Sequence, residues 1–125
     1  MRLEHIALQV AQPAEMAAWY CENFDMRIMH QVEEFCFFIA DDRGSMLEIY
    51  HNPDEPVPDY AAQTPIQMHV AFWSDDVLAD CERLEAAGAA VIGEPSLDAD
   101  GLGHAFLRDP WDVVLQVIRR AKPFV

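Results

Sequence analysis

Hydrophobic and polar residues alternate over residues 3–10 and then change period. The alternation is typical of a half-buried strand, with every second side chain on the same face. Pro13 suits the first turn of a helix, and Glu15 is favourable near its positive end. Apolar residues then recur at the i, i+3, i+4, i+7 spacing of a helix with one buried face: Ala17, Tyr20, Cys21 and Phe24.

Three further apolar segments complete the first 51 residues of the chain. Residues 26–32 and 35–40 are predicted strands joined at Glu33-Glu34, and Asp41-Asp42-Arg43-Gly44 predicts a tight turn before a strand at 46–51. Residues 52–65 hold four of the eight prolines, so they are expected to form a linker rather than a central strand or a helix.

The same order of elements is then repeated. Residues 66–73 predict a strand, and Ser74 is expected to cap a helix whose first turn holds Asp75 and Asp76. The buried stripe of that helix and its C-terminal stop are predicted at Val77, Cys81, Leu84 and Gly88. Strands are expected at residues 89–92, 104–108 and 113–118, with a polar loop at 93–103.

Each half therefore predicts strand, helix, strand, strand, strand. We expect an α+β fold made of paired βαβββ modules, with residues 1–51 as the first module, 52–65 as the linker and 66–125 as the second, together forming one compact domain. A chain of 125 residues with 52% hydrophobic content is long enough to bury a core.

Charge and cysteine usage narrow the functional classes. The formal net charge of −14 disfavours nucleic acid and anionic membranes as partners, because both repel an acidic surface. No apolar run approaches the roughly 18 residues of a membrane span, and nothing at the start resembles a signal peptide. The cysteines, Cys21, Cys36 and Cys81, are odd in number and lie in apolar segments, as expected for reduced thiols buried in a cytoplasmic protein.

Four polar residues interrupt apolar strands at matching places in the two halves: His5, Glu48, His69 and Gln116. The histidines are 64 residues apart, and Glu48 and Gln116 are 68 apart. Apart from Glu4 beside His5, their strand neighbours are apolar and point to the face that the helices must cover, so the four are expected on the opposite, concave face. Two imidazoles, a carboxylate and an amide oxygen suit a divalent metal of borderline hardness. Singly, each residue is more readily explained as an ordinary core or surface side chain; the matched set favours the metal site.

The order and spacing of several short motifs resemble the vicinal-oxygen-chelate superfamily, which includes glyoxalase I, bleomycin-resistance proteins and extradiol dioxygenases. The motifs are the segments 5–10, 18–24, 47–49, 69–72, 106–110 and 114–116. The resemblance implies curved mixed sheets around a cleft and a divalent metal ion (Ni, Zn, Co, Mn or Fe) held at His5, Glu48, His69 and Gln116. Two departures are Gln116, where many of these enzymes have Glu, and Asp109-Pro110-Trp111-Asp112-Val113 in place of the common Asp-Pro-Asp-Gly-Asn turn.

The resemblance implies a metal-dependent glyoxalase-like lyase or isomerase. Such an enzyme would stabilise an enediolate of a small substrate with vicinal oxygens while Glu48 acts as the catalytic base, because an amide such as Gln116 cannot. One alternative is an Fe(II) extradiol-type dioxygenase that uses His5, His69 and Glu48 as ligands. Another is a bleomycin-resistance-like protein that sequesters a ligand without a reaction.

Further residues are candidates for the substrate pocket: Trp73, His104, Phe106 and Arg108. Arg108 is the first candidate to bind a glutathione carboxylate, among only eight basic residues. A small-molecule substrate and a homodimer are expected, since in this family the cleft is formed within one chain or between two, and this chain is short.

Overall fold

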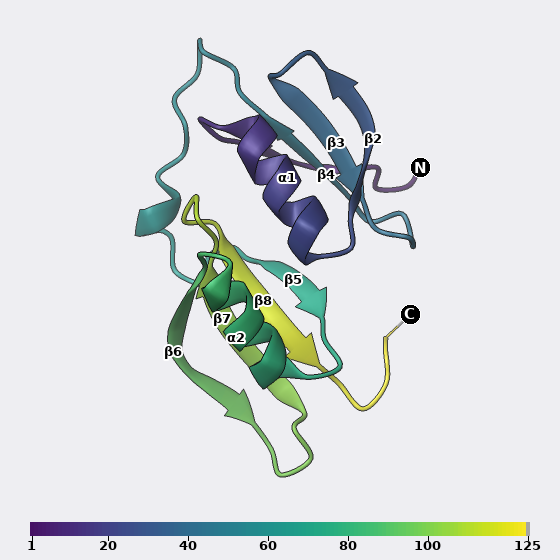
Figure 1. Ribbon diagram of the computed structural model, residues 1–125, viewed down its shortest axis with the longest axis vertical. Helices are drawn as coiled ribbons and strands as arrows, with labels where there is room; N and C mark the ends of the chain where they lie inside the picture. The colour runs from purple at the N-terminus through teal and green to yellow at the C-terminus, as the bar shows by residue number, and fades with distance from the viewer. Residues whose placement is uncertain (125) are drawn as a thin grey trace. The chain divides into compact units, whose positions relative to one another are not determined.

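The computed structural model describes residues 1–124 and divides the chain into two compact units. Unit 1 is Met1–Pro58 and unit 2 is Asp59–Val125. Each unit contains one α-helix and one four-stranded mixed sheet (Figure 1). The α+β class and the repeated order of strand, helix, strand, strand, strand are therefore confirmed.

Unit 1 is built on a sheet with strand order β1-β4-β3-β2. The elements are β1 (Ile6–Gln9), α1 (Pro13–Asn23), β2 (Arg27–Val32), β3 (Cys36–Ala40) and β4 (Met46–Tyr50). Strand β1 runs parallel to β4, and the other neighbours are antiparallel. The parallel pair is required because α1 crosses over between β1 and the rest of the sheet.

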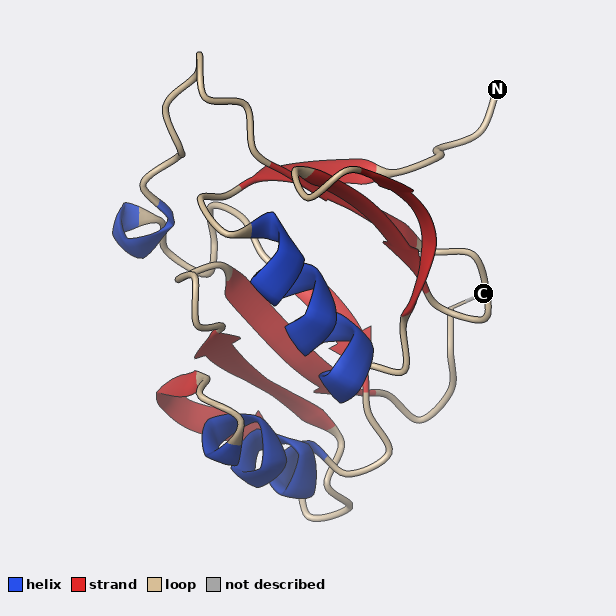
Figure 2. Ribbon diagram, turned by 45° about the horizontal axis from the view of Figure 1, so that its top comes forward, coloured by secondary structure: helices blue, strands red, loops and turns tan. Residues whose placement is uncertain are grey.

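Helix α1 covers one face of the unit 1 sheet (Figure 2). Met16, Ala17 and Tyr20 on the helix are fully buried, as are Ile39 and Ile49 on the sheet. Because side chains alternate along a strand, residues one position away from these lie on the uncovered face. Glu48 is therefore placed on the face opposite the helix.

Unit 2 repeats this topology in the order β5-β8-β7-β6. Its elements are the 3-10 helix Tyr60–Ala62, β5 (Val70–Trp73), α2 (Val77–Ala86), β6 (Ala90–Leu97), β7 (Gly103–Arg108) and β8 (Val114–Arg119). Strand β5 pairs in parallel with β8, as β1 does with β4. The predicted stripe on α2 is confirmed: Val77, Cys81 and Leu84 are all buried.

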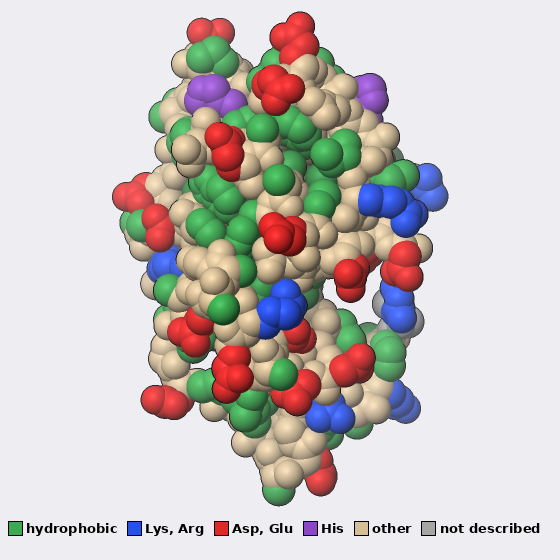
Figure 3. Space-filling view, viewed as in Figure 1, with side chains coloured by type: hydrophobic (Ala, Val, Ile, Leu, Met, Phe, Trp, Pro, Cys, Tyr) green, Lys and Arg blue, Asp and Glu red, His purple; other side chains and the backbone are tan. Residues whose placement is uncertain are grey.

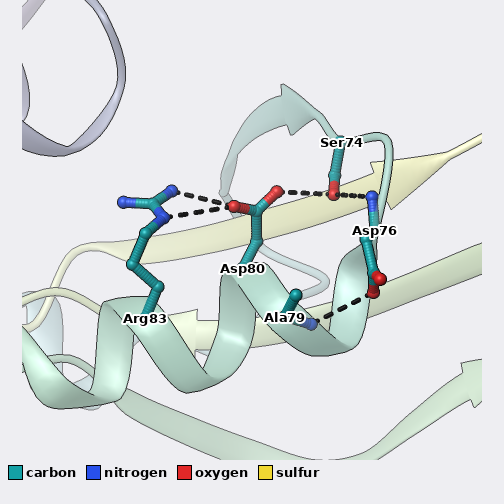
Figure 4. A network of polar contacts seen from close by, with 5 residues as sticks. All are labelled: Ser74, Asp76, Ala79, Asp80 and Arg83. Atoms are coloured by element: carbon teal, nitrogen blue, oxygen red, sulfur yellow. Dashed lines mark hydrogen bonds and ion pairs between the residues drawn. The ribbon is translucent and has the colours of Figure 1, made fainter.

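The start of α2 differs from the prediction because the capping residue is Asp76, not Ser74. The Asp76 side chain accepts a hydrogen bond from the Ala79 amide at 3.1 Å. Ser74 is buried and organises the turn: its Oγ accepts from the Asp76 amide and donates to Asp80 Oδ2 at 2.6 Å (Figure 4). Asp80 also forms an ion pair with Arg83, so the first turns of α2 are linked by one polar network.

Two predicted boundaries in unit 2 were wrong. Residues 66–68 alternate like a strand, but β8 pairs only with Val70–Trp73, so the strand begins later. Residues 93–97 contain a glycine and a proline and were predicted as loop, yet they belong to β6. The ladder between β6 and β7 shifts register between Ile92 and Ser96, which accommodates these residues in the strand.

Gly103 explains why pairing resumes after that shift. Its φ is 144°, and a Cβ atom at this position would lie 1.9 Å from the Ser96 carbonyl oxygen. Only glycine permits such a close approach between β7 and β6.

Acidic residues outnumber basic ones by 22 to 8. Asp and Glu side chains are scattered over the visible face of both units and do not gather in one patch (Figure 3). Among residues 1–124, no helix is both long and apolar enough to cross a membrane.

Candidate functional site

His5 and Glu48 are brought together by the pairing of β1 with β4. His5 lies one residue before β1, and the register places Ala7, two residues later, opposite Glu48. The Nε2 atom of His5 is 3.1 Å from Glu48 Oε2, and the two side chains are 31% and 22% exposed. The sequence prediction that these residues share one face is supported by this contact.

The ring of His5 lies between two carboxylates. Its Nδ1 contacts Glu4 Oε2, while Nε2 faces Glu48. A neutral imidazole carries only one N–H and can donate to only one of these oxygens. When Nδ1 donates to Glu4, Nε2 of the neutral ring presents a lone pair towards Glu48, an arrangement that a cation between Nε2 and Oε2 would complete.

Cys36 contacts the other oxygen of the Glu48 carboxylate. Its thiol donates to Oε1 at 3.4 Å. Burial, together with the hydrogen bond and the negative charge of Glu48, raises the pKa of the Cys36 thiol to about 11. Cys36 is therefore a neutral donor at physiological pH and not a nucleophile.

A cavity of about 580 Å³ opens beside Glu48 within unit 1. Phe35 and Cys36 line it from the start of β3, Glu48 and Tyr50 from β4, and residues 51–53 from the following segment. This volume lies in the range of cavities that bind small molecules. Among the described lining residues, Glu48 is the one with a carboxyl group, and none is Lys or Arg.

In unit 2, three of the predicted site residues meet through aromatic contacts. The rings of His69 and His104 each pack edge-on against Phe106, at centroid distances of 5.4 and 5.1 Å. Gln116 on β8 lies opposite Phe106 on β7 and, on its other side, opposite Ala71 on β5.

The orientation of the His69 ring is fixed by the backbone. Like His5, His69 lies one residue before its strand, and its Nδ1 is 2.7 Å from the Pro65 carbonyl oxygen. A carbonyl can only accept, so Nδ1 carries the proton and donates. In the neutral ring, Nε2 then holds the lone pair that a metal ligand needs.

The remaining pocket candidates are placed differently. Trp73 is 46% exposed at the end of β5. Arg108 donates from Nη1 to the carbonyls of Tyr60 and Asp112, both at 3.0 Å, and from Nη2 to the Gln63 carbonyl at 2.7 Å. Its guanidinium thus links β7 to the segment that precedes β5.

Among residues 1–124, no group of three or more His, Cys, Asp or Glu side chains is arranged to hold a metal ion. The predicted ligand set includes a glutamine and draws two residues from each unit. Within unit 1 the imidazole and carboxylate of that set are in contact, and within unit 2 His69 has the tautomer that a ligand requires.

Sequence reasoning did not identify Cys36, Phe38 and Tyr50 as site residues. Phe38 packs edge-on against His5 at 5.4 Å, as Phe106 does against His69. Phe38 and Phe106 are 68 residues apart, the same offset as Glu48 and Gln116. Extending that offset along the apolar strands is the signal that would have found it.

Two known proteins that are similar in sequence carry the same name. A probable lactoylglutathione lyase of Vibrio cholerae is 27% identical over 127 aligned positions, which cover 94% of this chain and 90% of that protein. A probable lactoylglutathione lyase of Vibrio parahaemolyticus is 26% identical with the same coverage.

Solved structures share the fold at lower identity. A glyoxalase/bleomycin resistance protein/dioxygenase family enzyme from Burkholderia phytofirmans aligns with a TM-score of 0.75 at 17% identity, covering 95% of this chain and 98% of that one. An antibiotic-binding protein from a Streptomyces species aligns at 0.69 and 20% identity, with 97% of each chain covered. A family model matches residues 2–117, and the chain belongs to the Glyoxalase/Bleomycin resistance protein/Dioxygenase superfamily.

Proposed function

We propose that this protein is a metal-dependent, glyoxalase-like lyase or isomerase that acts on a small substrate with vicinal oxygens. His5, Glu48, His69 and Gln116 are the proposed ligands of a divalent ion (Ni, Zn, Co, Mn or Fe), and Glu48 is the proposed catalytic base. The observation that carries the proposal is the contact of His5 Nε2 with Glu48 Oε2, made while His5 Nδ1 faces a second carboxylate.

The chemistry of this contact fits a metal ion. Nitrogen and oxygen ligands lie about 2.0–2.2 Å from zinc, so two neighbouring ligands of one ion are about 3.0 Å apart in octahedral and about 3.4 Å apart in tetrahedral geometry. The 3.1 Å between Nε2 and Oε2 is consistent with that spacing. A cation there would also fit both contacts of the ring, because the Nε2 lone pair would face positive charge while Nδ1 donates to Glu4.

The surroundings of both histidines support the same assignment. A ligating histidine usually donates its other ring N–H to a carboxylate or a backbone carbonyl, which fixes the tautomer. His5 has Glu4 in that role, and His69 has the Pro65 carbonyl. Gln116 offers a carbonyl oxygen as a ligand but no basic group.

A bound divalent ion would polarise the substrate oxygens and stabilise the charge of an enediolate. In this proposal, Glu48 takes and returns the carbon-bound proton. Its two oxygens have separate partners, since Cys36 donates to Oε1 and His5 faces Oε2. The thiol hydrogen bond holds the carboxylate in one orientation, so that the proton transfer needs little rearrangement.

The test is the metal content of the purified protein, measured by elemental analysis after dialysis. We expect near-stoichiometric divalent metal in the wild type and loss of it in His5→Ala/His69→Ala. The matched control is His30→Ala/His104→Ala, which also removes one histidine from each unit but none of the proposed ligands. A wild type that takes up no added metal, or a control that loses as much metal as the ligand variant, would refute the proposal.

The same measurement separates two other functions. Specific binding of Fe(II) with oxygen consumption on a catechol would favour the dioxygenase, with His5, His69 and Glu48 as ligands. Ligand sequestration without a reaction is favoured by one observation, the 580 Å³ cavity in unit 1. It would be the conclusion if the cavity binds a ligand and the protein takes up no metal.

A further inference from the structure

The cavity in unit 1 has a charge pattern that restricts its ligand. Glu48 contributes a carboxylate, and no Lys or Arg is present among the lining residues. Phe35, Tyr50 and Pro53 contribute apolar surface. The whole chain carries a formal net charge of −14, so no long-range field compensates the local one.

His51 and Asn52 in the lining are partly engaged by the protein itself. His51 Nδ1 is 3.0 Å from the Val10 carbonyl oxygen, so that nitrogen donates to it. The Asn52 side-chain oxygen accepts from the Asp54 amide, and the Asn52 carbonyl accepts from the Gln9 side chain. Glu48 differs because an ionised carboxylate accepts about four hydrogen bonds, and Cys36 and His5 occupy only part of that capacity.

Arg108, the first candidate from the sequence for binding an anionic substrate, has another role. Arg108 uses both Nη atoms on three backbone carbonyls of unit 2. Arg83 is paired with Asp80, and Arg120 packs over the ring of Phe124. Since no Lys or Arg lines the unit 1 cavity, a substrate with free carboxylates, such as a glutathione conjugate, would meet Glu48 there without a basic side chain in the walls to balance its charge.

We propose that this cavity receives the apolar body of the substrate, and that this body is uncharged or cationic rather than carboxylated. The inference rests on the proposed function for the position of the reacting oxygens at Glu48. It departs from the two Vibrio proteins named as probable lactoylglutathione lyases, because their named substrate carries carboxylates on its glutathione part.

The experiment compares three probes with one apolar body: 4-phenylbutylamine, 4-phenylbutanol and 4-phenylbutyrate. Each is titrated into isotopically labelled full-length protein in EDTA and 0.5 M NaCl, where the Debye length is only a few ångström. Dissociation constants are taken from the shifted amide signals of residues 35, 36 and 48–53. We expect the amine and the alcohol to bind at least about tenfold more tightly than the acid.

A variant that adds a cation to the cavity makes the test independent of the parent affinity. Phe35 lines the cavity but is 45% exposed, so Phe35→Arg should fold, and it is expected to raise the affinity for 4-phenylbutyrate at least about tenfold. The control is Ile28→Arg, which changes the net charge equally at a similarly exposed position, 48%, outside the lining. It is expected to leave all three affinities within about twofold.

The inference is overturned if the acid binds as tightly as the amine, if none of the probes shifts the cavity signals, or if Ile28→Arg acts like Phe35→Arg. Because EDTA removes metal, these outcomes do not depend on the proposed enzyme activity. Loss of the metal site in the elemental analysis would instead refute the proposed function and leave the charge preference of the cavity standing.

Discussion

In unit 1, Phe38 lies opposite Glu48 across β3 and β4; in unit 2, Phe106 lies opposite Gln116 across β7 and β8. Each phenylalanine packs edge-on against the histidine that precedes the first strand of its unit, at the same centroid distance of 5.4 Å. The two sheets therefore present a histidine, an aromatic ring and a polar side chain in the same arrangement.

The units differ at the positions next to this shared arrangement. Cys36 and His104 occupy equivalent positions, opposite Tyr50 and Ile118 respectively. Unit 1 combines a thiol, a carboxylate and a cavity, whereas unit 2 combines a second imidazole with an uncharged amide. The duplicated backbone thus supplies matching positions, and the side chains put the proposed base and the cavity in unit 1.

Exchanging the two polar residues is the strongest test of that assignment. Glu48→Gln removes the proposed base and is expected to lower kcat by about 10²–10⁴-fold, while Gln116→Glu is expected to change it by less than about tenfold. The assay is turnover of the phenylglyoxal hemithioacetal of N-acetylcysteamine by metal-loaded protein. Metal content is measured in both variants, so that loss of a base is separated from loss of a ligand. Full activity in Glu48→Gln would mean that Glu48 is not the base.

The two cores should be equally sensitive to truncation. Leu8 on β1 in unit 1 and Leu84 on α2 in unit 2 are both buried, and each change to alanine is expected to cost about 2–5 kcal/mol of unfolding free energy. The matched control is Leu78→Ala, because Leu78 lies on the same helix as Leu84 but is 52% exposed. Denaturant unfolding followed by circular dichroism measures all three. A cost for Leu78→Ala similar to that of Leu84→Ala would contradict the described packing of α2.

Arg108 should act on stability more than on substrate binding. Arg108→Ala leaves three backbone carbonyls without their charged donor and is expected to cost about 1–3 kcal/mol. Arg108→Lys should recover only part of this, since an ammonium cannot reproduce the fork of the guanidinium. Thermal unfolding gives the cost, and KM is measured in parallel. A large rise in KM at unchanged stability would instead make Arg108 a substrate-binding residue.

Periodicity was sufficient for the repeated fold but not for every strand boundary. The change from period 2 to helical spacing located α1 and α2 because both signals lie in adjacent residues. The predictions for residues 66–68 and 93–97 were wrong because the limits of a strand depend on a partner that is distant in sequence. Residues 66–68 alternate but have no strand partner. Residues 93–97 belong to β6 despite Gly93 and Pro95, because Ser96 and Leu97 pair with β7.

The candidate site was predictable to the extent that it repeats. His5 and Glu48 were found because His69 and Gln116 match them along the chain. Cys36 was not found, because a cysteine in an apolar strand is indistinguishable from a small core residue in the sequence. Only the three-dimensional contact of its thiol with Glu48 Oε1 reveals a polar role.

The contact between Cys36 and Glu48 gives the smallest expected effect, a change in the pKa of the Cys36 thiol. That pKa should respond to a substitution in unit 1 but not to one in unit 2. In Glu48→Gln the pKa of the Cys36 thiol should fall below its value of about 11 but stay above 9.0, because burial is the larger cause of the increase and is retained. Gln116→Glu should leave it unchanged. Thiolate absorbance near 240 nm is titrated in a Cys21→Ala/Cys81→Ala background, where Cys36 is the remaining thiol.

The same thiol has a consequence for stability at alkaline pH. Its pKa is raised by folding, so the folded state holds this proton more tightly than the unfolded state between about pH 9 and pH 11. The stabilisation that belongs to the neutral thiol is therefore complete below pH 9 and is lost as the pH rises towards 11. Cys36→Ala should flatten the decline of unfolding free energy over this interval, measured by denaturant titration at each pH. A decline that is unchanged in Cys36→Ala would assign the alkaline sensitivity to other groups. It would also mean that the thiol next to Glu48 becomes exposed to solvent before the protein unfolds.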